Sequence, residues 1–232
     1  YIDTYHRTGL YPIPLPSGIG LEACCVIEEV GPEVKLFKVG DRVSHASMPI
    51  GAYSEKHIMP ENKLVPVPDG VSDEVAACVT LKGITAEYLL HRAYPLKKGD
   101  KVLYHAAAGA LGQILCPWAN SIGAEIIGTV GSKEKEEIAK KNGCHHIINY
   151  TDKNFVEEVE KIVGKNGIDV VYDGVGLKTF EGSIEVLKIR GMMVAFGNAS
   201  GYVDTIDVKK HINAKGLFFT RPSIAHYTIK RE

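Results

Sequence analysis

The sequence predicts an α/β protein that combines a doubly wound parallel sheet with a smaller, mostly β region. Residues 101–130 contain a strand, a helix and a second strand, joined by a glycine-rich turn. From residue 99 to residue 196, short apolar runs alternate regularly with helical patterns, as in a parallel sheet covered by helices. Residues 1–80, in contrast, contain short apolar runs separated by Gly and Pro turns.

The first strand–helix–strand unit is the clearest part of the pattern. It begins with the apolar run Val102–Tyr104, which is typical of a strand buried on both faces. Small residues fill positions 106–110, and apolar residues then recur with helical spacing from Leu111 until Gly123 ends the pattern. A second apolar run, Ile126–Val130, predicts the returning strand.

The turn of this unit has the spacing of a dinucleotide-binding loop. In the G-x-G-x-x-G pattern the first glycine makes a tight turn, the second admits the pyrophosphate, and the third lets helix and strand pack closely. The corresponding residues are Ala107, Gly109 and Gly112, so alanine replaces the first glycine. A plain tight turn is the alternative, but the position between two apolar strands and a periodic helix favours a dinucleotide.

One residue conflicts with the predicted helix. Pro117 removes a backbone hydrogen bond and its ring clashes with the carbonyl of residue 113, at a cost of about 3 kcal/mol. The sequence leaves open whether the helix kinks or a neighbour compensates.

Further strands and helices follow in alternation, and the turns after three strands contain Gly109, Gly174 and Gly197. Because ligands of such sheets bind beyond the carboxyl ends of the strands, these turns are expected to line one site. The predicted elements are helix 133–142, strand 146–149, helix 155–163, strand 169–172, helix 180–187 and strand 192–196.

The amino-terminal region predicts strands at 23–30, 42–45 and 52–58, spaced as in a compact, partly open barrel. Between residues 71 and 90 the pattern changes to helix-favouring residues, which predicts a domain boundary near Lys82 and Gly83.

The end of the second strand indicates which dinucleotide binds. NAD-binding loops are followed, about 20 residues later, by an acidic residue that binds the ribose hydroxyl. Here that place holds Val130, Gly131 and Ser132, followed by Lys133 and Lys135. With no carboxylate to repel a 2′-phosphate and with lysine to pair with it, the sequence favours NADPH over NADH. The alternative is that both lysines are ordinary solvated residues of a helix surface.

Composition excludes several classes of protein. The 232 residues are 45% hydrophobic and 24% charged, as in a globular protein, and 27 basic residues balance 28 acidic ones. Neither a basic stripe for nucleic acid nor an apolar run of membrane-spanning length is present, and no signal peptide is visible. Five cysteines without a C-x-x-C pair argue against disulfides and against a four-cysteine zinc site, so a cytoplasmic location is expected.

Several motifs together resemble those of one family, the zeta-crystallin-like quinone oxidoreductases of the medium-chain dehydrogenase/reductase superfamily. The resemblance extends over essentially the whole chain. The motifs are IDTYHRTGLYP at 2–12, GAYSEKH at 51–57, HAAAGALGQ at 105–113, VVYDGVG at 170–176, VAFGNASG at 194–201 and TRPS at 220–223.

The resemblance implies a GroES-like catalytic domain interrupted by a Rossmann domain. Residues 1–82 would form part of the catalytic domain, 83–219 the NADPH-binding Rossmann domain, and 220–232 the start of the return to the catalytic domain. The catalytic domain would then be truncated at both ends. Members of the family are usually homodimers through the Rossmann sheet.

The resemblance also implies the activity: hydride transfer from NADPH to a quinone in the interdomain cleft. Zinc-dependent relatives carry Gly-His-Glu where this chain has Gly20-Leu21-Glu22, so the activity is expected to be independent of zinc. The implied catalytic residues are Tyr5, Tyr11 and Arg221. The cofactor residues, from the resemblance and the loop pattern together, are Thr85, Tyr88, Gly109, Ala110, Leu111, Gly131, Ser132, Lys135, Tyr150, Gly174, Val175, Phe196, Gly197 and Asn198.

The sequence leaves two alternatives to a quinone reductase open. The first is an enone or alkenal double-bond reductase on the same fold. The second is a non-catalytic role as a crystallin-type or RNA-binding protein, against which the balanced charge argues. The histidines, including His105 at the end of a strand, form no catalytic or metal-binding set and are interpreted as structural.

Overall fold

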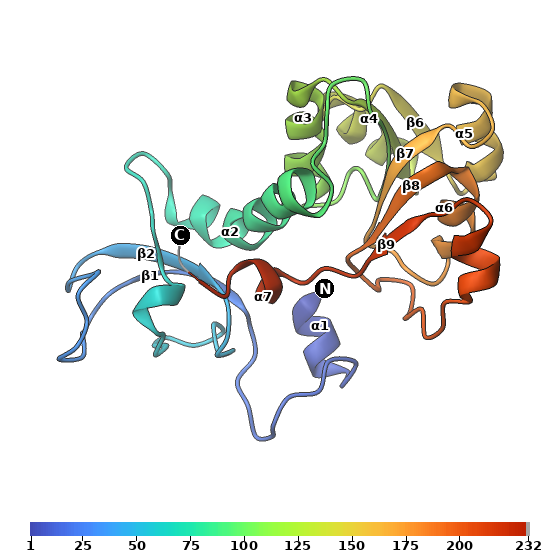
Figure 1. The fold of residues 1–232 in the computed structure, drawn as a ribbon. Helices are drawn as coiled ribbons and strands as arrows, with labels where there is room; N and C mark the ends of the chain where they lie inside the picture. Colours follow the sequence, from blue (N-terminus) through green and yellow to red (C-terminus); the bar gives the residue numbers. More distant parts are fainter. Residues whose placement is uncertain (231–232) are drawn as a thin grey trace. The chain divides into compact units, whose positions relative to one another are not determined.

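The computed structural model describes residues 1–230 (Figure 1), and these residues divide into two compact units. One unit is Tyr1–Ile84 together with the end of the chain from Tyr227, and the other is Thr85–His226. Helix α2 (Asp73–Tyr88) continues through both the predicted boundary at residues 82 and 83 and the division after Ile84.

The unit Thr85–His226 is built on a six-stranded parallel sheet, which confirms the predicted doubly wound fold. Its strand order is β6-β5-β4-β7-β8-β9, so the first strand in sequence is central and the chain reverses direction across the sheet beside it. This is the order of dinucleotide-binding domains. The strands are β4 (Lys101–His105), β5 (Glu125–Val130), β6 (His146–Asn149), β7 (Ile168–Asp173), β8 (Leu187–Ala195) and β9 (Phe218–Thr220).

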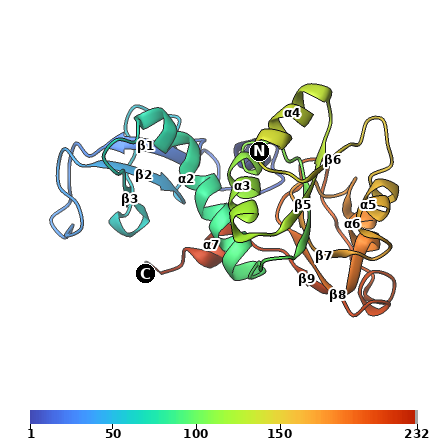
Figure 2. The same ribbon diagram turned by 90° about the horizontal axis from the view of Figure 1, so that it is seen from above.

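Helices cover both faces of this sheet. Helices α3 and α4 lie against one face, and α5 and α6 lie against the other (Figures 1 and 2). The helices are α3 (Gly112–Ile122), α4 (Lys133–Lys141), α5 (Phe155–Val163) and α6 (Phe180–Val186), with π-helical segments η2 (Leu89–Ala93) and η3 (Val208–Asn213).

The core of this unit follows from the continuous apolar runs of strands that are buried on both faces. Leu103, Ile127, Val171 and Met193 belong to one cluster with residues of α5 and α6, and each is at most 1% exposed. Strand β8 begins at Leu187, earlier than predicted, because its pairing with β7 shifts register between Ile168 and Val170.

The unit Tyr1–Ile84 contains a three-stranded antiparallel sheet, β1 (Glu22–Val26), β2 (Arg42–Ala46) and β3 (Val65–Pro66). It also contains a short helix that the sequence did not predict, α1 (Ile2–Arg7), and a 3₁₀ turn, η1 (Glu61–Lys63). A further short helix, α7 (Ile224–Tyr227), lies where the chain returns to this unit.

The predicted strand at residues 52–58 is wrong. This segment is irregular, and Tyr53 and Ile58 are 70% and 91% exposed, so its two largest apolar side chains are not buried against a sheet. The Ser54 hydroxyl lies 2.6 Å and 2.8 Å from the carbonyl oxygens of Gly51 and Lys56, which makes a local turn of the kind that competes with strand pairing. Among the described residues, no helix is long and apolar enough to cross a membrane.

Pro117 is accommodated inside a continuous helix. Helix α3 runs from Gly112 to Ile122 through the proline, and both Pro117 and Gln113 are exposed. The carbonyl of Gln113, which lost its helical donor, is therefore on the side of the helix where water can replace the missing N–H.

Replacement of Pro117 by alanine is expected to raise the free energy of unfolding by about 1–3 kcal/mol. Alanine restores the N–H donor and removes the ring clash, and the exposed position loses no packing. Chemical unfolding of wild type and variant measures the difference. Ser121→Ala, at another exposed position of α3, is the control and should change stability by at most about 0.5 kcal/mol. A Pro117→Ala variant no more stable than its control would contradict this expectation.

Candidate cofactor and active site

The reversal of strand order between β4 and β7 defines the place where a ligand of this sheet binds. The loops that follow these two strands, at residues 106–111 and 174–176, flank this position. Strands β5 and β8 end beside them, at Val130 and Ala195. Most of the cofactor residues expected from the sequence lie in these four loops.

The turn after β4 explains why alanine can replace the first glycine of the motif. Ala106, not Ala107, adopts a left-handed conformation, with φ of 63°. The third motif position requires glycine, because a Cβ atom on Gly112 would lie 2.3 Å from the Ala107 carbonyl oxygen. The start of helix α3 therefore packs closely against the residues that follow β4, and the exposed Gly109 and Ala110 lie in the turn between strand and helix.

The loop after β5 packs against the residue that follows β6. A Cβ atom on Gly131 would lie 2.5 Å from the hydroxyl oxygen of Tyr150, so the phenol lies directly over this glycine. Ser132 caps α4, its Oγ accepting a hydrogen bond from the Lys135 backbone amide at 3.4 Å. The amides of a helix start, a phenol hydroxyl and the exposed Lys133 and Lys135 thus meet at one end of α4.

Two acidic residues of α4 have partners within this region. The Asn149 amide donates to the Glu136 carboxylate at 3.0 Å. A hydrogen bond with the Ser132 hydroxyl, and a second with its own backbone amide, lower the pKa of Glu134. Neither acid occupies the end of β5, where a carboxylate that selects NAD would lie.

The loops after β7 and β8 are in direct backbone contact. A Cβ atom on Gly197 would lie 2.4 Å from the Gly174 carbonyl oxygen, and one on Gly174 would lie 2.9 Å from the ring of Phe196. The Ser200 amide donates to the Val175 carbonyl at 2.8 Å, and Asn198 is 6% exposed. The structure therefore brings together all five residues expected from these two loops.

Three further cofactor candidates lie in helices or at their starts. Thr85 and Tyr88 are in the last turn of α2, where Thr85 is half-buried and Tyr88 is buried. Leu111 immediately precedes α3 and is half-buried.

The catalytic candidates divide between the two units. Tyr5 and Tyr11 lie in the unit Tyr1–Ile84, with their rings 5.1 Å apart and inclined by 60°, and the Tyr11 amide donates to the Tyr5 carbonyl at 3.1 Å. Arg221 belongs to the unit Thr85–His226, where its guanidinium donates to the Pro222 carbonyl at 3.2 Å. The structure brings the two tyrosines into contact.

An ion pair occupies the place where zinc-dependent relatives carry Gly-His-Glu. Leu21 is 6% exposed. Glu22 accepts a hydrogen bond from the Leu81 amide at 2.6 Å and forms a salt bridge with Lys82. The two charged side chains of the pair are only 11% and 27% exposed, for Glu22 and Lys82 respectively. Sequence reasoning did not identify Lys82 as a partner, because nothing in their spacing joins residues 60 positions apart.

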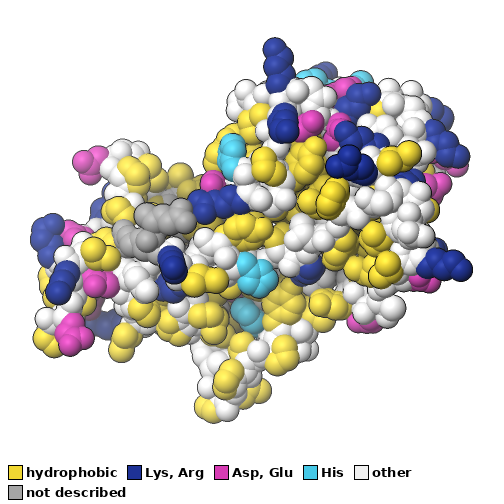
Figure 3. Space-filling model, viewed as in Figure 1, with side chains coloured by type: hydrophobic (Ala, Val, Ile, Leu, Met, Phe, Trp, Pro, Cys, Tyr) yellow, Lys and Arg dark blue, Asp and Glu magenta, His cyan; other side chains and the backbone are white. Residues whose placement is uncertain are grey.

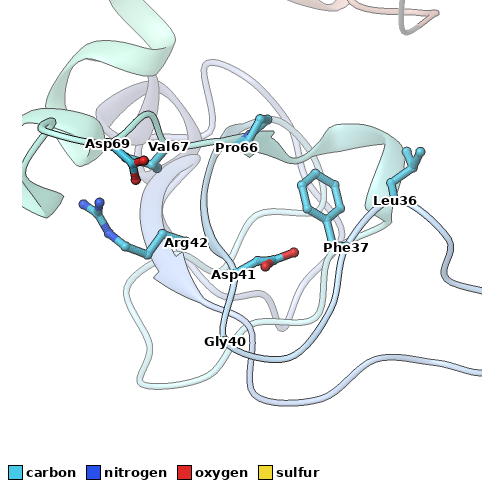
Figure 4. A pocket seen from close by; sticks show the side chains of 8 residues that line it. All are labelled: Leu36, Phe37, Gly40, Asp41, Arg42, Pro66, Val67 and Asp69. Carbon is cyan, nitrogen blue, oxygen red and sulfur yellow. The ribbon is translucent and has the colours of Figure 1, made fainter.

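A surface cavity of about 480 Å³ lies elsewhere in the unit Tyr1–Ile84 (Figure 4). Arg42 and Asp69 lie on one side of it, Leu36 and Phe37 on the other. None of the residues that line it is a candidate from the sequence. The face seen in Figure 3 shows basic and acidic side chains interspersed, without a broad patch of one sign.

Two family models match the chain. The model described as "Alcohol dehydrogenase GroES-like domain" matches residues 1–69, and the model described as "Zinc-binding dehydrogenase" matches residues 110–231. Together they have the domain order of the medium-chain dehydrogenase/reductases.

Individual relatives identify the family within this superfamily more closely. A 2-haloacrylate reductase from Burkholderia sp is 48% identical over 239 residues, covering the whole chain and 72% of the relative. Quinone oxidoreductase 1 of Escherichia coli (strain K12) is 46% identical over 234 residues, covering the whole chain and 71% of the relative. The crystal structure of Escherichia coli quinone oxidoreductase complexed with NADPH has a TM-score of 0.94 at 46% identity, covering 97% of this chain and 70% of that one. The chain therefore belongs to the quinone oxidoreductase family of the medium-chain dehydrogenase/reductase superfamily, as the sequence motifs indicated.

Acidification is expected to destabilise the protein through His105, which is 1% exposed. Burial lowers the pKa of His105, although the nearby Asp173 carboxylate opposes this effect. Below the histidine pKa of about 6.5 in the unfolded state, the unfolded chain binds a proton at this residue that the folded protein does not bind. The free energy of unfolding therefore falls below about pH 6.5, with a slope of up to about 1.4 kcal/mol per pH unit from this group.

Urea unfolding between about pH 5 and pH 8 measures this slope. The variant His105→Gln should show a shallower slope than the wild type, with part of the slope remaining because burial also lowers the pKa of His45. Identical slopes would assign the effect to other groups.

Proposed function

We propose that this chain is an NADPH-dependent quinone reductase that transfers hydride from the nicotinamide to a bound quinone without zinc. The observation that carries the cofactor assignment is the contact between Gly131 and Tyr150, which leaves no room for a side chain at residue 131, directly after β5. The NADPH-bound quinone oxidoreductase relative supports it.

The residues present fit NADPH. Gly131, Ser132, Lys135 and Tyr150 would hold the 2′-phosphate, with the lysine as counter-ion and the phenol as hydrogen-bond donor. The amides that begin α3, next to Gly109, would face the pyrophosphate. The rest of the cofactor would lie against the remaining candidates: Thr85, Tyr88, Ala110, Leu111, Gly174, Val175, Phe196, Gly197 and Asn198.

The cofactor supplies the hydride, and the protein positions it and stabilises charge on the acceptor oxygen. We assign this second role to Tyr5, Tyr11 and Arg221, which carry hydroxyl and guanidinium donors. Independence of zinc is supported by Leu21, which has no metal-binding group, and by the salt bridge that already neutralises Glu22. The Lys82 ammonium neutralises the buried Glu22 carboxylate, as a metal cation would, but it cannot coordinate a substrate.

The relative named 2-haloacrylate reductase favours a second candidate function, reduction of a conjugated carbon–carbon double bond. Quinones and acrylates share the feature that matters for hydride transfer, an electrophilic carbon conjugated to a carbonyl or carboxyl group. The same cofactor site would serve either acceptor, so the difference lies in the acceptor pocket.

The proposal also covers the domain organisation and the oligomeric state. Residues 83–219 are assigned to NADPH binding, and residues 1–82 and 220–232 to the catalytic domain. A cytoplasmic homodimer is proposed, with β9, at the edge of the six-stranded sheet, available for pairing. The net charge of −1 gives no basis for nucleic-acid binding.

NADPH consumption tests the function. The protein is mixed with NADPH and a quinone, an enone, an acrylate or an aldehyde, each with and without EDTA. The quinone should give the highest kcat/KM, and EDTA should leave it unchanged. A preference for the acrylate or enone would select the second candidate, and loss of activity in EDTA would overturn zinc independence.

Lys135→Ala should weaken NADPH binding by about 10- to 150-fold, because one charge-assisted phosphate contact contributes about 1.5–3 kcal/mol. NADH, which lacks the 2′-phosphate, should bind almost unchanged. Calorimetric titration of both cofactors measures the two affinities. Lys141→Ala, at the other end of α4, is the matched control and should alter neither. Equal losses for NADPH and NADH would remove the assignment of Lys135.

A further inference from the structure

Four buried polar side chains at the carboxyl edge of the sheet are not among the residues proposed to bind the cofactor or the quinone. His105 ends β4, Thr129 lies near the end of β5, Asp173 ends β7, and Ser183 lies in α6. Each of them is at most 1% exposed. Buried polar groups remain stable only when they are hydrogen-bonded, so their partners define their role.

The four side chains form one continuous chain of hydrogen bonds. Thr129 Oγ lies 3.0 Å from His105 Nδ1, and His105 Nε2 lies 3.0 Å from Ser183 Oγ. Ser183 Oγ donates to Asp173 Oδ2 at 3.3 Å. Phe155 meets the His105 ring edge-on at 5.0 Å and helps to fix its orientation.

The donors around Asp173 determine the direction of the chain. Its Oδ1 accepts hydrogen bonds from the Val175 and Gly176 amides at 2.8 Å and 3.0 Å, and its Oδ2 accepts one from the Thr179 hydroxyl at 2.7 Å. A carboxylate with this many donors is an acceptor only, so the Ser183 hydroxyl must point toward it.

The tautomer of His105 follows from this direction. Because the Ser183 hydrogen is directed to Asp173, its oxygen is left to accept from His105 Nε2–H. Nδ1 then accepts from the Thr129 hydroxyl. Burial favours the neutral imidazole that this arrangement requires.

We propose that His105 and Ser183 are positioning residues, links of a one-directional chain, Thr129 to His105 to Ser183 to Asp173, that holds the loops of the cofactor site in register. Thr129 is two residues before Gly131, His105 directly precedes the turn at residues 106–111, and Asp173 binds the amides of its own loop. The hydrogen-bond chain thus joins the Gly131 loop, assigned to the 2′-phosphate, with the loop at residues 174–176, assigned to the rest of the cofactor. This role rests on the proposed NADPH site, whereas the direction of the chain does not.

The tautomer of His105 tests the direction. Nitrogen NMR of protein with labelled histidine should show a proton on Nε2 in the wild type. In Asp173→Asn, the amide oxygen accepts from the two loop amides and its NH₂ group faces Ser183. The serine must then donate to His105, and the proton should move to Nδ1. A wild type with the proton on Nδ1, or a tautomer unchanged in Asp173→Asn, would overturn the proposal.

Thr129→Val provides a second variant in case Asp173→Asn fails to fold. Valine has nearly the shape of threonine and suits a strand, but it removes the donor to Nδ1. Because the direction is set from the Asp173 end, the proton should stay on Nε2. A move to Nδ1 would show that Thr129 sets the direction and would overturn the proposal.

Ligand binding tests the coupling between loops. Ser183→Ala interrupts the chain with the loss of one oxygen and should weaken NADPH by about 3- to 10-fold. It should weaken adenosine 2′,5′-bisphosphate by a similar factor, although this fragment, which lacks the nicotinamide half of the cofactor, ends at the Gly131 loop and the start of α3. Ser183→Thr should restore binding, and Ser121→Ala, whose hydroxyl donates to the Trp118 carbonyl on the surface of α3, should leave it unchanged.

The outcomes separate the two proposals. Loss of NADPH affinity with unchanged binding of the fragment would overturn the coupling while leaving the NADPH site intact. A wild-type protein that does not bind NADPH would overturn the proposed function and with it the role of the chain. The tautomer experiment would still decide its direction.

Discussion

The close approach of backbone to backbone at the ends of the strands is the constraint on which the site depends. Gly112 lets the start of α3 contact the Ala107 carbonyl, and Gly197 lets the loop after β8 contact Gly174. A single methyl group at either position would separate elements that the structure holds in contact. The parallel sheet provides the common edge, and these contacts hold the loops of the proposed cofactor site close together along it.

The sequence predicted the sheet well because the strands of the unit Thr85–His226 are buried on both faces. Such strands are continuous apolar runs, and each is followed by a turn with glycine or a polar residue. The edge strand β9 was not predicted, since a three-residue strand with a half-exposed Phe218 has no such pattern. Residues 52–58 gave the opposite error: the spacing of the turns predicted a strand there, but neither sheet of the described residues includes them.

The sequence predicted those site residues for which the local backbone requires one residue type. It did not predict contacts between side chains that are far apart in the sequence. Gly112 and Gly131 follow from motif spacing, and the structure supplies the contacts that exclude a side chain at both. The salt bridge between Glu22 and Lys82 joins positions 60 residues apart, and the link between His105 and Ser183 spans 78. The only local signal for the second was a polar residue at the end of an apolar strand, as at Asp173.

The chain of hydrogen bonds that links Thr129, His105, Ser183 and Asp173 contributes more to the orientation of the loops than to the stability of the fold. A buried carboxylate is costly to desolvate, and a well-packed apolar replacement of a buried ionic group is often at least as stable. Apolar side chains would, however, tolerate small rotations of one loop against the next, whereas a hydrogen-bond chain with one direction has one arrangement that satisfies every member. In the proposed NADPH site, the loops carried by β4, β5 and β7 present donors to different parts of one ligand. A geometry fixed before binding reduces the ordering that the ligand must impose, which strengthens every contact that depends on it.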